Sequence, residues 1–208
     1  MDGGKVSKNI YHNAQLGFSY EFPHGWVVND KSTQQRAHNE RHQFAWADDL
    51  SARWEKPPSR HCSRGLLLVT KYPEEMHTND FNPLGFLAVA DPQCAPTVRF
   101  PTSVKDTDAV ERVAGQLGLY VKTPTINSRG AARLRVFESN GRVVITVLER
   151  LNFMTYEPGI STNQDLLSET TVMQAGDCWI VLMFLGESDA DLAPLRASQI
   201  RFDVLSPK

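Results

Sequence analysis

The stretch that decides the fold is residues 17–26, GFSYEFPHGW. Its first six residues alternate between small or polar and aromatic side chains, the period of a β-strand with one buried face. Pro23, His24 and Gly25 then interrupt this pattern, because proline fixes φ and glycine accepts positive φ. Trp26 and the two valines that follow it resume as a second short strand. An aromatic strand, a tight turn and a tryptophan are therefore predicted near the start of the chain.

The second half of the chain predicts a hairpin around Asn140-Gly141, a dipeptide typical of two-residue turns between strands. The flanking strands are predicted at residues 131–138 and 142–150. Because successive side chains of a strand point to opposite faces, the register predicts four apolar side chains facing the core. These are Leu134, Val136, Ile145 and Val147.

A second hairpin is predicted between residues 167–173 and 178–185, around Ala175-Gly176. Its returning strand is apolar throughout, which indicates a central strand covered on both faces. Periodicity predicts a buried strand at 65–72, a strand or short helix at 84–89 and a closing strand at 200–202. Capping residues predict two helices. One spans 103–117, where Ser103 with Asp106 caps the start and Gly118 ends it, and a shorter one is opened by Ser188 and Asp191.

These elements predict an α+β protein, with an antiparallel sheet and helices packed on its faces. The length of 208 residues suits one domain, 1–208. Residues 30–64 are largely polar and lack an apolar stripe, so we expect a polar insertion there.

The overall charge is nearly balanced, with 22 basic against 24 acidic side chains and a formal net charge of -2. Broad binding to nucleic acid normally needs a basic face, so no nucleic-acid partner is predicted. The longest apolar run, residues 178–185, is too short to span a membrane. The polar opening at 1–9 predicts a cytoplasmic protein; an exported one is expected instead if a leader has been removed.

The three cysteines, Cys62, Cys94 and Cys178, show no CxxC spacing. An odd number is typical of a reducing compartment. Cys178 lies in the apolar run and is predicted to be a buried small hydrophobe. In an exported protein, Cys62 and Cys94 are the pair that could form a disulfide.

The beginning and end of the chain resemble PsbP-like domains. The resemblance rests on Tyr11-His12-Asn13, on residues 16–23 and Gly25-Trp26, and on the end of the chain, where an acidic turn at 187–189 precedes a short helix and an Ile-x-Phe strand. It implies an α/β/α sandwich around a central antiparallel sheet. PsbP is an extrinsic subunit of photosystem II, and a nuclear transport factor that binds the Ran GTPase has the same fold. The resembling residues are fold residues, so no site is carried over.

The sequence contains no recognised catalytic motif: GxGxxG, GxxxxGK[ST] and GxSxG are all absent. His38 and His42 are four residues apart, so on a helix both imidazoles would lie on one face, as a metal site requires. With His61 and Cys62 they would complete a transition-metal set. The other interpretation is a solvated polar insertion that happens to contain histidines. No other cofactor is predicted.

The first hairpin also predicts an interaction surface. Arg133, Arg135, Phe137 and Val144 share the face opposite to the predicted core side chains. An apolar, arginine-bearing sheet surface either packs under a helix or meets a partner. The sequence therefore favours a non-enzymatic binding or accessory module acting through protein-protein contacts, with an unknown partner. The alternatives are a metal-binding protein and a hydrolase in which His24 or His42 meets a Ser, Cys or carboxylate.

Overall fold

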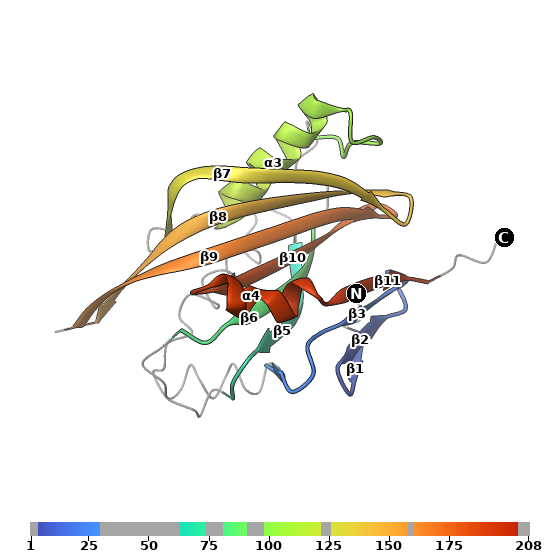
Figure 1. Cartoon of the computed structure of the whole chain (residues 1–208). Coiled ribbons are helices and arrows are strands. Elements are labelled where there is room, and N and C mark those ends of the chain that lie inside the picture. The colour runs from blue at the N-terminus through green and yellow to red at the C-terminus, as the bar shows by residue number, and fades with distance from the viewer. Residues whose placement is uncertain are drawn as a thin grey trace.

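The computed structural model describes residues 4–29, 63–73, 81–90, 98–121, 126–157 and 160–203. These residues form two antiparallel sheets and two helices (Figure 1). In order across it, the seven-stranded sheet contains β4 (Val27–Val28), β5 (Ser63–Thr70), β6 (Leu84–Ala90), β10 (Cys178–Gly186), β9 (Ile160–Ala175), β8 (Arg142–Glu157) and β7 (Ile126–Ser139). The four-stranded sheet contains β1 (Lys5–Ser7), β2 (Ile10–Asn13), β3 (Phe18–Glu21) and β11 (Gln199–Phe202).

The molecule has three layers, with helix α3 (Thr107–Val121) on one face of the large sheet and helix α4 (Asp189–Arg196) on the other (Figure 1). Val110 and Val113 of α3 pack on the buried side chains Ile145, Val172 and Val181. On the opposite face the small sheet and α4 together bury a second set: Phe18, Tyr20, Leu192, Leu195, Ile180 and Phe184. The predicted α+β sandwich with a central antiparallel sheet is therefore confirmed, with one outer layer shared by a helix and a small sheet.

The opening stretch behaves as its alternation predicts, since Phe18, Tyr20 and Phe22 are all buried. Its two strands nevertheless belong to different sheets. Gly25, at φ 84°, lies in the turn after which the chain continues as β4 of the large sheet. β3 instead pairs with β2 and with the closing strand β11, so the small sheet joins the two ends of the chain.

The predicted register of the first hairpin is confirmed: Val136 pairs with Ile145 and Leu134 with Val147 across the ladder. The prediction that Leu134 faces the core is wrong, because its side chain is 42% exposed. β7 is the last strand of the sheet, and α3 packs chiefly over β8. Leu134, on the outermost strand, therefore stays at the surface, whereas its partner Val147 on β8 is buried.

The start of α3 also differs from the prediction. The helix begins at Thr107, four residues after the predicted cap Ser103. Asp106 caps it instead, because its Oδ1 accepts a hydrogen bond from the Ala109 amide (3.3 Å). Gly118 was predicted to end the helix but lies inside it, since α3 continues to Val121.

The second hairpin, the strand at β6 and the capping box of α4 are confirmed. Cys178 is half-buried at the start of β10, less covered than predicted. β8 and β9 stay paired out to Glu157 and Ile160, past the end of β10, and project as a two-stranded ribbon (Figure 1).

Most of the expected insertion, residues 30–62, lies outside the described residues, as do both Cys62 and Cys94. Among the described helices, none is long and apolar enough to cross a membrane.

Candidate interaction surface

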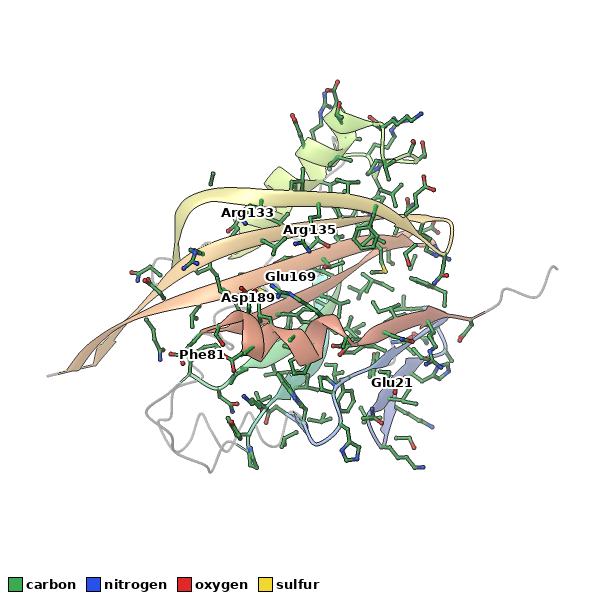
Figure 2. All side chains as sticks on the ribbon, viewed as in Figure 1. Glu21, Phe81, Arg133, Arg135, Glu169 and Asp189 are labelled. Carbon is green, nitrogen blue, oxygen red and sulfur yellow. The ribbon has the colours of Figure 1, made fainter. Side chains whose placement is uncertain are left out.

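The hairpin of β7 and β8 presents a group of exposed side chains on the same side of the large sheet as α4. Arg133 and Arg135 lie on this side (Figure 2), and strand alternation places Phe137 and Arg150 there too. All four are exposed, and Phe137 keeps 47% of its surface accessible. We call Arg133, Arg135, Phe137 and Arg150 the arginine face.

The arginine face rests on well-ordered strand pairing. Phe137 pairs with Val144 and Arg135 with Thr146 across the ladder. Val144 is only 3% exposed, so this predicted surface residue belongs instead to the core beside the face. The Thr146 and Thr171 hydroxyls are 2.9 Å apart, which adds a cross-strand hydrogen bond between β8 and β9. The face therefore rests on a packed platform.

The charges of Arg133 and Arg135 are not balanced locally, since neither makes an ion pair with a described residue. Arg133 pairs with Leu148 of β8, and Leu148 pairs in turn with Glu169 of β9, so Glu169 is the carboxylate in line with Arg133 across the sheet. Glu169 is already engaged, because its carboxylate accepts a hydrogen bond from Arg196 Nε at 2.6 Å. Two exposed guanidinium groups thus have no acidic partner within the part of the chain that the structure describes.

Arg196 connects α4 to the sheet. Besides Glu169, it donates to Asp189 at 2.8 Å. Burial alone would lower the pKa of Arg196, but the hydrogen bonds to Asp189 and Glu169 outweigh it and raise that pKa. This network holds the helix on the sheet and engages Glu169, the carboxylate on β9 in line with Arg133 and Leu148.

Arg142, at the turn of the hairpin, has a structural role. Its guanidinium lies 4.1 Å from the centroid of the Phe202 ring and donates to the Gln174 carbonyl at 2.9 Å. Phe202 belongs to β11, so Arg142 ties the small sheet to the large one. It is not part of the arginine face.

A second charged cluster lies at the start of α4. Ser188 and Asp191 form the predicted capping box, and Lys71 is 3.3 Å from Asp191 Oδ1. Burial would raise the pKa of Asp191, but hydrogen bonds from Ser188 and Lys71 outweigh it and lower that pKa. All three residues are used in holding the helix start, which gives this cluster a structural explanation.

The metal and hydrolase hypotheses concern residues that the structure largely does not describe. His38, His42, His61 and Cys62 lie outside the described residues. Among the described residues, no three His, Cys, Asp or Glu side chains are grouped so that they could hold a metal ion. His24 is exposed in the turn between β3 and β4.

One pair that the sequence analysis missed is His12 and Ser19, whose Nδ1 and Oγ atoms are 3.0 Å apart. They are cross-strand neighbours on β2 and β3, so only the strand pairing could have revealed them. A nucleophilic serine needs a base that is itself oriented by a third group. No hydrogen bond between His12 and a carboxylate occurs among the described residues, so the pair is explained as a polar contact on an exposed strand face.

Fold and surface together define an α+β protein with a three-layered antiparallel sandwich and an arginine-bearing hairpin face that is exposed among the residues described. The structure is similar to the solution structure of cyanobacterial PsbP from Synechocystis sp. PCC 6803, with a TM-score of 0.45 and 12% identity. The alignment covers 97% of this chain and 98% of that one. The similarity is limited to the fold. No family model and no curated protein matches the chain.

Proposed function

We propose that this protein is a non-enzymatic binding module that acts through protein-protein contacts made by its arginine face. The observation that carries the proposal is the grouping of exposed Arg133, Arg135 and Phe137 on one side of the edge strand β7. Arginine and aromatic side chains are enriched in protein interfaces, where the ring supplies buried area and the guanidinium supplies directional hydrogen bonds.

The platform beneath the face supports this function. A surface whose backbone is already ordered loses little conformational entropy when a partner binds. β8 lies between β7 and β9 in the large sheet, and the cross-strand neighbour of Phe137, Val144, is buried. The side chains of the arginine face are thus the groups that still have to be ordered on binding.

The charge of the arginine face also supports a binding function. An ion pair inside the molecule would explain Arg133 and Arg135 as structural residues, but neither has such a partner among the described side chains. Unpaired arginines beside an exposed aromatic ring are suited to a partner that brings carboxylates, since the guanidinium binds a carboxylate through two parallel hydrogen bonds.

The test compares the proteins that co-purify with three baits from a lysate of the source cells: the wild type, Arg133→Glu/Arg135→Glu, and Lys105→Glu/Arg112→Glu. The control pair consists of exposed cations near or on α3, beyond the opposite face of the sheet, and causes the same change in net charge. We expect the wild type and the control to retain a common protein that the first variant loses. Equal retention by all three baits contradicts the proposal.

A further inference from the structure

The outer edge of β7 is unpaired in the part of the chain that the structure describes. β7 ends the strand order of the large sheet, and its ladder runs only to β8. No backbone hydrogen bond from residues 126–139 to a turn or loop occurs among the described residues. A long edge strand with free N–H and C=O groups is a template for pairing with another chain.

The turn of the hairpin determines which backbone groups point outward. Asn140 and Gly141 have φ values of 52° and 70°, as a two-residue turn of type I′ requires. In such a hairpin Ser139 and Arg142 exchange hydrogen bonds, and bonded and non-bonded pairs then alternate along the ladder.

This alternation determines which residues of β7 bond to β8 through their backbone and which point their backbone groups outward. Arg133, Arg135 and Phe137 direct their N–H and C=O groups toward β8. Three intervening residues direct theirs toward the open edge: Leu134, Val136 and Glu138. A strand added to β7 would form its hydrogen bonds with these three residues.

We infer that the edge of β7 binds an acidic segment of a partner protein in extended conformation, which adds to the large sheet as one further strand. This inference rests on the proposed function and names the class of partner. Side chains on one face of the added strand lie beside Arg133 and Arg135, so carboxylates are favoured there. Those on the other face lie near the exposed side chain of Leu134, where apolar groups are favoured. The partner segment therefore alternates acidic and apolar residues.

A second copy of this chain would meet like charges in two of the registers open to it. Two β7 strands paired antiparallel about Leu134 place Arg133 of one copy opposite Arg135 of the other, and pairing about Arg135 places that residue opposite itself. Like charges directly opposite each other in a sheet are destabilising. An acidic segment removes this repulsion and neutralises both guanidinium groups.

The test uses a short blocked peptide that alternates glutamate and valine, with a lysine-valine peptide as the charge control, and measures binding by fluorescence anisotropy. Leu134→Pro removes one outward N–H without touching the β8 ladder, whereas Leu134→Ala keeps that N–H. We expect the wild type and Leu134→Ala to bind the glutamate peptide alike. Leu134→Pro and Arg133→Glu/Arg135→Glu should each weaken binding by about tenfold or more, which corresponds to about 1.4 kcal/mol. The lysine peptide should not bind.

If Leu134→Pro fails to fold, an N-methylated form of the glutamate peptide tests the same hydrogen bonds. Methylating the peptide amides that would pair with β7 removes the same hydrogen bonds from the ligand side, and we expect this to abolish binding to the wild type. Equal binding of the methylated and plain peptides overturns strand addition. Sedimentation that shows a wild-type dimer, dissociated by Leu134→Pro, identifies a second copy as the occupant and also overturns the inference.

The outcomes separate this inference from the proposed function. If no glutamate peptide binds but Arg133→Glu/Arg135→Glu still loses its co-purified protein, strand addition is wrong and the arginine face remains a binding surface. If the co-purified protein is also unaffected, both are wrong.

Discussion

At the scale of single residues, the carboxylate of Glu169 is a buried charge that Arg196 neutralises. Its Nε lies 2.6 Å from the Glu169 carboxylate, and the Glu169 residue is 8% exposed. A carboxylate removed from water and deprived of its cation is strongly destabilising, so this pair holds α4 against β9.

Replacement of Arg196 by methionine keeps the apolar stem but removes the partner of Glu169. We expect Arg196→Met to lower the free energy of unfolding by about 2 kcal/mol, the scale of a hydrogen bond to a charged group, as measured by urea unfolding. Arg201→Met is the control, because Arg201 pairs with Glu21 at 3.2 Å on an exposed surface. Arg201→Met should lower the free energy of unfolding by less than about 0.5 kcal/mol. Equal costs for the two variants would show that the Arg196 pair does not hold the helix.

Asp191 gives the protein a pH-dependent contribution to stability. Since its pKa is lowered in the folded state, the contribution is present above the unfolded pKa of about 4 and is lost as the pH falls through the folded value. We expect the free energy of unfolding of the wild type, measured in urea, to exceed that of Asp191→Asn by about 1 kcal/mol at neutral pH. The difference should shrink below about pH 4. A difference that stays constant down to acid pH would exclude this role of the carboxylate.

At the scale of elements, α4 fits closely against the sheet where the sheet offers glycine. A Cβ added at Gly186 would lie 2.7 Å from the Asp191 Cβ, and one added at Gly85 would lie 2.9 Å from the Leu195 Cδ2. The helix can approach β10 and β6 this closely only because both positions lack a side chain.

Two glycine substitutions test this close approach, because one should lower the stability of the protein and the other, at an open position, should raise it. We expect Gly186→Ala to lower the free energy of unfolding by about 1–3 kcal/mol, because the first turn of α4 must move away. Gly115 lies in α3 with open space around its Cβ position, so Gly115→Ala should raise stability by about 0.5–1 kcal/mol. Thermal unfolding of both variants measures the difference. A neutral or stabilising Gly186→Ala would mean that α4 does not pack against the sheet as described.

The elements also show where local sequence signals are sufficient. Asn140-Gly141 fixes the turn and hence the pairing of Val136 with Ile145, so the hairpin register was predictable. The cap of α3 was not, because Ser103 and Asp106 are both good capping residues and the choice depends on the turn between them. Which strand lies at an edge depends on the whole sheet, and this is why the exposure of Leu134 was missed.

At the scale of the whole molecule, the small sheet is built from both ends of the chain. β11 pairs with β3, and Phe202 of β11 contacts the Phe18 ring at a centroid distance of 6.4 Å. Because such a pairing joins distant parts of the chain, periodicity could predict the strands but not their common sheet. The arginine face is a similar case. The sequence predicted Arg133, Arg135 and Phe137, whereas the addition of Arg150, the burial of Val144 and the edge left unpaired by the described residues came from the structure.

Phe202 links the small sheet to the large one, since it also lies under the Arg142 guanidinium at 4.1 Å. We expect Phe202→Ala to cost about 2 kcal/mol, less than a fully buried phenylalanine because its ring is half-buried. Amide hydrogen exchange should accelerate first in β2 and β3 and leave β9 and β10 protected. Equal acceleration in all four strands would show that the small sheet does not open as a separate unit.

The central claim is that the arginine face meets a partner protein, and a photo-crosslinking amino acid placed at Phe137 tests it most directly. Tyr72 is the matched control, because it is also aromatic and is 38% exposed, at the other end of the strand order, just after β5. In a lysate of the source cells, we expect the probe at position 137 to give a discrete covalent adduct with a second protein and the probe at position 72 to give none. No adduct at position 137, or the same adducts at both positions, would contradict the claim.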